Sequence, residues 1–193
     1  MNQPISYFDD DRRTHYRVDD DVYLEYLVLG EAEVANAIHE FEQETHRHFN
    51  PLNQLHAITI RHRPLLDAVR TKWPEIGAYL LSIDERIQLL AHAIAQDQVG
   101  VPIVPNESVN ISAGGISFAS EQPLDNSAVL EFSIIIVPSY LHIYALGKIV
   151  YCRDNTAVDP AFPFRIGVEF SHIHDADRDA LIRHVQQRRE TPT

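Results

Sequence analysis

The stretch AVLEFSIIIVPSYLHIYALGKIVYCRD, residues 128–154, contains two apolar runs separated by Pro138 and Ser139. Both runs are rich in Val, Ile, Phe and Tyr, the residue types that favour strands. A proline followed by a serine is a turn signal. The stretch therefore predicts two strands of a β-rich domain.

Neighbouring segments extend this β-rich region in both directions. GGISFAS at 114–120 precedes it and FRIGVEFSHI at 164–173 follows it, each with the same strand-type composition. Segments rich in turn-forming residues, at 121–127 and 154–163, separate these runs. The chain from Val99 onward therefore predicts a small antiparallel β domain.

The last segment, HDADRDALIRHVQQRRE at 174–190, predicts a C-terminal helix. Asp175 is a suitable N-cap, because its carboxylate can accept a hydrogen bond from an amide of the first turn. We expect Leu181, Ile182 and Val185 to face inward. Two arginines in the last turn suit the negative end of the helix dipole.

Upstream, residues 31 to about 98 predict helices. Apolar residues recur at alternating spacings of three and four from Leu66 to Ile94, as in the heptad stripe of a coiled coil. Pro74 interrupts this pattern and predicts either a kink or the start of a new helix. The most regular part of the stripe comprises Ile76, Leu80, Ile83, Ile87, Leu90 and Ile94.

Two interpretations of this stripe stay open: a helix that packs on its own domain, or a helix that assembles subunits. Within the chain we expect only the shorter helix near 31–48 as a partner, which favours self-association. Isoleucine fills four of the six positions, and this side-chain shape favours assemblies larger than dimers. We therefore expect a homo-oligomer.

Composition narrows the class of protein. The chain has 193 residues and a formal net charge of −12, which argues against nucleic-acid polymers as partners because their phosphates would be repelled. The sequence lacks a run of about 18 apolar residues that could span a membrane, and it does not begin like a secretory signal. The single cysteine, Cys152, fits a reducing compartment. We expect a cytoplasmic protein.

The N-terminal region combines a strand with a cluster of arginines. VYLEYLVLG at 22–30 predicts a first strand that is buried mostly on both faces and ended by its final glycine. Arg12, Arg13 and Arg17 precede this strand and are flanked by aspartates on both sides. Guanidinium groups bind phosphates through paired hydrogen bonds, so the cluster indicates a site for a phosphorylated ligand. The alternative is a solvated charge run in which the arginines pair with the flanking aspartates.

Two motifs, in this order, resemble the signature of a known family. Arg13 and Arg17 form R-x-x-x-R before the first strand, and Asn110, Ser112 and Gly115 form N-x-S-x-x-G at a later strand. The pair resembles the signature of PilZ domains, the receptors for the bacterial second messenger cyclic di-GMP. FRIGVEF, followed by a polar turn and a helix, also resembles the end of such a domain.

The resemblance covers residues 12–29 and 108–190, and it implies a mainly β, α+β fold: a six-stranded antiparallel β-barrel with a C-terminal helix. The helical insertion after the first strand is similar to the atypical, tetrameric branch of the family, which implies a homotetramer held by a coiled coil. The expected organisation is residues 1–30 for the motif tail and first strand, 31–98 for the oligomerisation insertion, and 99–193 for the remaining barrel and C-terminal helix.

The resemblance also implies how cyclic di-GMP would be bound. A guanidinium can pair with guanine or with phosphate, and a short amide can meet the guanine N–H groups. Because these residues include no nucleophile or acid–base pair, we expect a receptor, not an enzyme, that needs no cofactor. It would switch conformation on binding and signal to an unidentified protein partner. The expected contacts are Arg12, Arg13, Arg17, Asn110, Ser112 and Gly115.

Two alternatives to a receptor stay open. Asn110 stands where many members of the family carry Asp, which removes a charge-assisted bond to guanine. An oligomeric PilZ-like adaptor that does not bind cyclic di-GMP would use the arginines only in ion pairs. A metal-dependent enzyme is the other alternative, since histidine pairs occur at 46–48 and 172–174. Neither pair has a third ligand that spacing identifies, so we expect no metal site.

Overall fold

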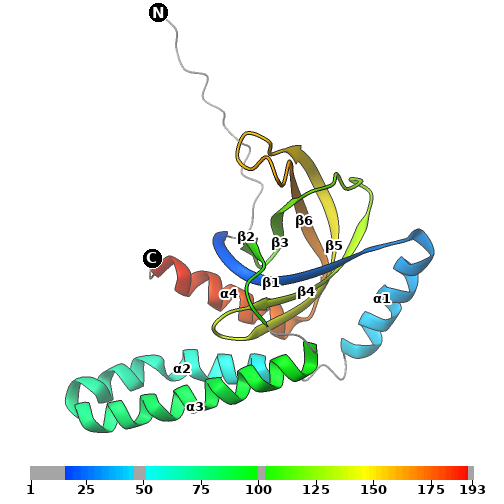
Figure 1. The fold of residues 1–193 in the computed structure, drawn as a ribbon. Helices are drawn as coiled ribbons and strands as arrows, with labels where there is room; N and C mark the ends of the chain where they lie inside the picture. The colour runs from blue at the N-terminus through cyan, green and yellow to red at the C-terminus, as the bar shows by residue number, and fades with distance from the viewer. Residues whose placement is uncertain (1–15, 46–50, 100–102, 191–193) are drawn as a thin grey trace, which may run out of the picture.

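The chain folds around a closed β-barrel (Figure 1). The computed structural model describes residues 16–45, 51–99 and 103–190. Six strands follow one another around the barrel in the order β1-β2-β3-β6-β5-β4, and all neighbours are antiparallel. The predicted fold class is thereby confirmed. The strands are β1 (Val18–Leu29), β2 (Glu107–Ser112), β3 (Gly115–Ser120), β4 (Val129–Ile136), β5 (Leu141–Asp154) and β6 (Phe164–Ile173).

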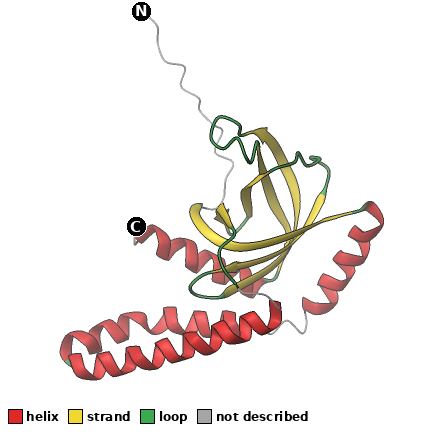
Figure 2. Ribbon diagram, in the orientation of Figure 1, coloured by secondary structure: helices red, strands yellow, loops and turns green. Residues whose placement is uncertain are grey.

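Helices lie outside the barrel and are drawn in red in Figure 2. Three of them separate β1 from β2, and one follows β6. Within the described residues, no helix has both the length and the apolar character needed to cross a membrane. The helices are α1 (Glu31–Thr45), α2 (Pro51–Lys72), α3 (Pro74–Val99) and α4 (Asp175–Glu190).

Strand β1 closes the barrel because it pairs with two neighbours in succession. Its first residues, Val18–Val22, pair with β2, and residues Val22–Leu29 pair with β4. A long strand of this kind joins the two ends of the sheet. The helical segment between β1 and β2 therefore leaves and rejoins the sheet without opening the barrel.

The barrel interior is the main hydrophobic core. Its largest side chains, among them Phe118, Phe132 and Ile134, are fully buried. Helix α4 closes this core with Leu181 and Val185, which confirms their predicted inward orientation, while Ile182 is half-buried. Burial of one large aliphatic side chain contributes roughly 1.5–3 kcal/mol, so this core is the main source of the barrel's stability.

The N-terminus of α4 differs by one residue from its prediction. The amide of Arg178 donates to the carbonyl of His174 at 2.9 Å, which makes His174 the residue that accepts the first helical hydrogen bond. Asp175 is therefore the first residue of the helix and not its N-cap. Its carboxylate still lies at the positive end of the helix dipole.

Strand β1 is buried over only part of its length. Leu24 is buried as expected, but Tyr26, Leu27 and Val28 are exposed, so the expected burial on both faces is wrong for this half of the strand. The reason is the placement of the helices: α3 packs near Tyr23, and α1 packs near the far end of the strand. Among the described residues, the stretch between these contacts is left uncovered.

Helices α2 and α3 form an antiparallel hairpin that turns at Trp73 (Figures 1 and 2). Pro74 begins α3, which is one of the two alternatives that its position predicted. The prediction that the helix near 31–48 is the partner of α3 within the chain is wrong, because α2 packs against α3. The reversal at Trp73 also divides the long apolar stripe between two helices. Sequence spacing alone cannot distinguish this hairpin from one continuous helix.

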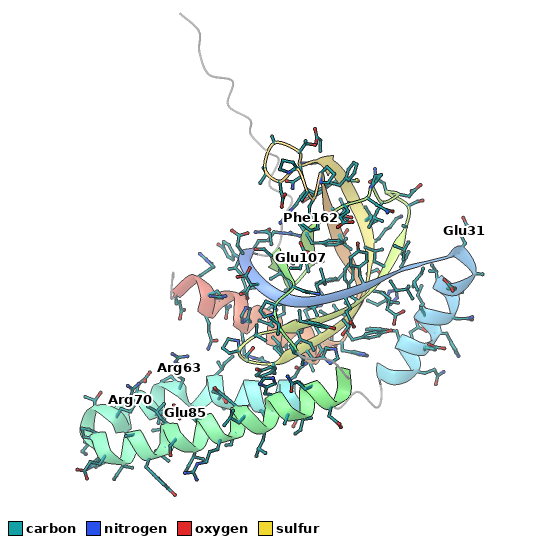
Figure 3. All side chains as sticks on the ribbon, in the orientation of Figure 1. Glu31, Arg63, Arg70, Glu85, Glu107 and Phe162 are labelled. Atoms are coloured by element: carbon teal, nitrogen blue, oxygen red, sulfur yellow. The ribbon has the colours of Figure 1, made fainter. Side chains whose placement is uncertain are left out.

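The base of the hairpin is anchored to the barrel. Ala91 and Ala95 of α3 pack against Tyr23 and Ile135. On α2, the side chain of Asn53 bonds to the backbone of His142 in both directions, as a donor at 2.7 Å and as an acceptor at 2.9 Å. The opposite end of the hairpin, where Figure 3 labels Arg70, projects away from the barrel.

The apolar stripe on α3 lies largely on the surface of the single chain. Leu90 is 65% exposed and Ile76 is 53% exposed, and the described part of the chain leaves Ile94 accessible as well. Leu80 and Ile87 are at the margin of exposure, and Ile83 is half-buried. Helix α2 therefore covers a neighbouring face of α3 and leaves most of this stripe accessible.

Candidate ligand-binding surface

The N-x-S-x-x-G motif forms the turn between β2 and β3. Asn110 lies on the outer face of β2, Ser112 ends β2, and Gly115 begins β3. Ser112 is buried, and its hydroxyl accepts a hydrogen bond from the amide of Gly114 and donates one to the carbonyl of Gly115, both at 3.3 Å. The Ser112 side chain therefore shapes the turn.

Gly115 is required by the close approach of β3 to β6. A Cβ atom at this position would lie 2.2 Å from the carbonyl oxygen of Val168, far inside contact distance. The neighbouring turn residue, Gly114, accepts a hydrogen bond from the amide of Phe170 at 2.9 Å. The motif turn is thus held firmly against β6.

Arg17 brings the two motifs together. Its guanidinium donates to the backbone oxygen of Asn110 at 3.2 Å and to the side-chain oxygen at 3.3 Å, although the residues are 93 positions apart. The Asn110 amide in turn donates to Asp19 at 2.8 Å. The predicted site residues Arg12 and Arg13 lie outside the described residues.

Strand register extends this site into a row across five strands. Residues directly opposite each other in antiparallel strands place their side chains on the same face. Here that face is the outer surface of the barrel, because the alternate residues of β2 and β3 fill the core. The row consists of Asp19, Asn110, Ser117, Gly167 and Tyr151.

Ser117 is the centre of a hydrogen-bonded group in this row. Arg165 donates to the Ser117 hydroxyl at 2.7 Å and to the Ser117 carbonyl at 3.0 Å. The Tyr151 hydroxyl also donates to the Ser117 hydroxyl, at 3.2 Å. Gly167 leaves room for the Tyr151 ring, since a Cβ atom there would lie 2.1 Å from it. Sequence analysis did not identify any of these residues as part of the site.

A third arginine lies beside this group. The Arg153 guanidinium is stacked over the Tyr151 ring at 4.4 Å from its centroid, and Arg153 is opposite Arg165 in the β5–β6 register. The outer face of β2, β3, β6 and β5 therefore presents Arg17, Arg165 and Arg153 together with an aromatic ring. These groups suit an anionic ligand that carries planar bases.

Glu107 lies close to this surface, and Figure 3 labels it on the barrel, apart from Arg63 and Glu85 on the hairpin. Burial raises the pKa of Glu107. The amide of Ala119, which donates to this carboxylate at 3.3 Å, and the positive charge of Arg165 both act to lower it. The Glu107 carboxylate therefore lies within electrostatic reach of Arg165.

Asp20 belongs to a buried cluster that joins β1 to α4. It is buried and accepts hydrogen bonds from His184 at 2.6 Å and from Arg188, both on α4. Burial alone would raise the pKa of Asp20, but the bonds and charges of His184 and Arg188 lower it overall. Asp20 is thus bonded to α4, which differs from the alternative in which the flanking aspartates pair with the N-terminal arginines.

The histidine pair at 172–174 contacts an aromatic side chain of α1. His174 is stacked on the Phe41 ring at 4.2 Å, and His172 meets the edge of the same ring at 5.8 Å. Among the residues that the structure describes, no group of three histidine, cysteine or acidic side chains could hold a metal ion. The other pair, at 46–48, lies outside the described residues.

The chain is a small closed β-barrel with a polar, arginine-bearing outer face. A sequence model of the PilZ domain matches residues 84–187, which is more than half of the chain. The chain therefore belongs to the PilZ family. The match begins inside α3, so the matched residues do not include β1 or the first motif arginines.

A solved structure of low sequence identity supports the same fold. A Xanthomonas campestris protein, described as a pathogenic protein with a tetrameric PilZ domain self-assembled through an unusual helical bundle, is similar with a TM-score of 0.50 and 11% identity. The similarity covers 92% of this chain and 89% of that one. The inhibitor of motility from Bacillus subtilis, MotI/DgrA, has a TM-score of 0.37 and 21% identity over 44% of this chain and 41% of its own. A search of curated protein sequences found no match.

Proposed function

We propose that this protein is a cytoplasmic receptor for cyclic di-GMP. The observation that carries the proposal is the contact between Arg17 and Asn110, which joins the R-x-x-x-R and N-x-S-x-x-G motifs on one face of the barrel. Membership of the PilZ family supports the ligand class. A single cysteine, half-buried and without a disulfide, is in keeping with a reducing compartment.

The chemistry of this surface matches that of the ligand. Cyclic di-GMP has two anionic phosphates and two guanines, and the surface offers arginine forks for the phosphates or the guanine edges. The Tyr151 ring, with Arg153 above it, offers a stacking surface for a base. The groups that the described part of this surface offers, guanidiniums, hydroxyls and an aromatic ring, suit recognition, so the proposed role is binding without catalysis.

Binding is proposed to act as a switch. Ligand would bring Arg12 and Arg13 against the surface around Asn110 and Ser112, next to Arg17. Closure of this N-terminal segment over the barrel would change the surface offered to a downstream protein. The ligand is thus proposed to change which partner the receptor can engage.

We also propose that the chain forms a homotetramer through α3. Large apolar side chains on one face of a helix are commonly buried by self-association when the chain itself does not cover them. The tetrameric assembly described for the Xanthomonas campestris protein supports this proposal. The proposed contact residues are Ile76, Leu80, Ile83, Ile87, Leu90 and Ile94.

One observation favours a second candidate, an oligomeric adaptor of the same fold that does not bind cyclic di-GMP. Ser112 is buried, and its hydroxyl is hydrogen-bonded within its own turn. Ligand would therefore have to displace existing contacts. An adaptor would keep these contacts permanently.

Titration calorimetry distinguishes the two candidates. We expect saturable binding of cyclic di-GMP to the wild-type protein and loss of at least tenfold in affinity in Arg13→Ala/Arg17→Ala, because two charge-assisted contacts are removed. The control variant Arg61→Ala/Arg63→Ala removes two exposed arginines of α2 and should bind like the wild type. Absence of binding to a folded wild-type protein would contradict the receptor and favour the adaptor.

A further inference from the structure

We infer that helix α4 couples the ligand-binding surface to the α2–α3 hairpin. The inference rests on the proposed receptor function. It concerns how ligand binding at the barrel surface would affect the α2–α3 hairpin, which is proposed to form the subunit interface. Helix α4 contacts both regions through side-chain bonds of its own. Four such contacts, three at the ligand side and one at the hairpin side, support the inference.

The first contact holds the N-x-S-x-x-G turn. Arg178, in the first turn of α4, donates to the carbonyl oxygen of Ala113 at 3.0 Å. Ala113 lies between Ser112 and Gly115, so this bond joins the helix directly to the motif. A shift of the turn on ligand binding would pull on α4 through this bond.

The second contact is the buried cluster around Asp20. His184 and Arg188 of α4 bind the two carboxylate oxygens of Asp20, which is 4% exposed. The next residue back, Asp19, accepts a hydrogen bond from Asn110. A buried carboxylate is costly to leave without partners, so α4 must follow any displacement of this part of β1.

The third contact involves the segment that leads into β1. The Arg189 guanidinium of α4 is stacked over the Tyr16 ring at 3.9 Å. Tyr16 is adjacent to Arg17, which contacts Asn110. A ligand that repositions Arg17 would therefore also change the contact at the C-terminal end of α4.

The hairpin side of the coupling is a bond between α4 and α2. Asp177 is fully buried, and it accepts a hydrogen bond from the Asn53 side chain at 2.5 Å. The same Asn53 amide is bonded to the backbone of His142 on β5. Asn53 thus joins the base of the hairpin to both α4 and the barrel.

These contacts make α4 a single rigid connection between the two regions. Arg178 and Asp177 are neighbours in its first turn, so the residue that holds the motif turn is adjacent to the residue that holds the hairpin. Buried polar groups with satisfied bonds resist partial rearrangement. Coupling is reciprocal, so hairpin docking and ligand affinity should influence each other.

Hydrogen exchange measured with and without cyclic di-GMP tests this inference in the full-length protein, with calorimetry on the same samples. In the wild type we expect ligand to slow amide exchange severalfold in α4 and in residues 51–60 of α2. In Asn53→Ala, cyclic di-GMP should still bind, and the effect on α4 should persist while the effect on residues 51–60 is lost. Asp177→Asn keeps an oxygen that can accept from Asn53, and it should retain the effect.

Asn106→Ala is the matched control. Asn106 also bonds to strand backbone in both directions, at 2.8 and 3.0 Å to Leu24, but these bonds do not involve α4. In the Asn106→Ala variant, ligand should still slow amide exchange in residues 51–60. Ligand binding to the wild type without any change in these residues would overturn the coupling and leave the receptor intact. Absence of ligand binding in calorimetry would overturn the receptor function and the coupling together.

Discussion

Asp20 illustrates how one buried carboxylate can hold a helix on the barrel. Its two oxygens are bonded to different residues of α4, His184 and Arg188, so both bonds favour the same docked position. The hydrogen bonds and charges of His184 and Arg188 outweigh the effect of burial, so the pKa of Asp20 is lowered. The first strand and the last helix are joined at this residue.

This lowered pKa predicts a pH dependence of stability. An unfolded Asp takes up its proton near pH 4, whereas folded Asp20 remains charged to lower pH. Its contribution is therefore fully present above about pH 4 and is lost as the pH falls through the lowered pKa. We expect Asp20→Asn to lower the free energy of unfolding at neutral pH by about 3 kcal/mol, since it removes the charge and one of the two oxygens that accept from the buried His184 and the partly exposed Arg188.

Urea denaturation across a range of pH measures both effects. The exposed neighbour Asp21 provides the control, since Asp21→Asn should leave the free energy of unfolding within about 0.5 kcal/mol of the wild type. The acid-side loss of stability should be smaller in Asp20→Asn than in the wild type. An unchanged loss would show that Asp20 is not responsible for it.

Arg165 has two roles that substitution can separate. It holds Ser117 through two hydrogen bonds, and it presents positive charge on the proposed ligand surface. Arg165→Lys keeps the charge but lacks the planar fork, so we expect a smaller loss of cyclic di-GMP affinity than in Arg165→Ala. For Arg165→Ala we expect a loss of about tenfold to a hundredfold, the usual effect of a bond to a charged group.

Calorimetric titration measures these affinities. Arg86→Ala, at an exposed position of α3 distant in the chain from the barrel face, is the control and should bind as the wild type does. Equal affinity in Arg165→Ala and the wild type would exclude Arg165 from the ligand-binding surface.

Among the helices, α3 shows how one element can serve two surfaces. One face carries small residues, Ala91 and Ala95, that pack against Tyr23 and Ile135 and fix the hairpin to the barrel. The adjacent face carries the large apolar stripe that stays accessible. Helix α3 therefore carries more apolar side chains than it buries within one chain.

Charges placed on this stripe test the proposed assembly. We expect Ile87→Glu/Leu90→Glu to convert the oligomer to a monomer, because each carboxylate would be buried in an apolar interface. Light scattering after size-exclusion chromatography measures the mass, and circular dichroism measures retention of the fold. Gln54→Glu/Thr59→Glu adds the same two charges at exposed positions of α2 and should leave the mass unchanged. A wild-type protein that is monomeric at micromolar concentration would contradict the assembly.

The whole molecule depends on two long-range pairings. Strand β1 is separated from β2 by the three helices, yet it closes the barrel and supplies Asp19 to the candidate ligand-binding surface. Helix α4, at the other end of the described chain, contacts β1, the motif turn and α2. The helical insertion is therefore attached in two ways. Helix α3 packs directly on the sheet, and α2 is bonded to α4.

Local patterns were sufficient to predict most of the elements. The strand-type runs correspond to β3, β4, β5 and β6, and the turn at Pro138 joins β4 to β5, because composition and turn chemistry act over a few residues. Arg17 and Asn110 were predicted to bind one ligand from opposite sides, which stays a prediction; in the structure the two residues contact each other directly. That prediction came from a family resemblance, since spacing alone does not bring residues 93 positions apart together.

Tertiary contacts determined the rest. Ser117, Tyr151 and Arg165 become one hydrogen-bonded group only through the register of β3, β6 and β5, which nothing in their local sequence specifies. The partner of α3 and the binding of Asp20 to α4 likewise depend on packing between segments far apart in the chain. Periodicity identifies which residues of an element are apolar, but the free energy that selects their partners comes from burial in the complete fold.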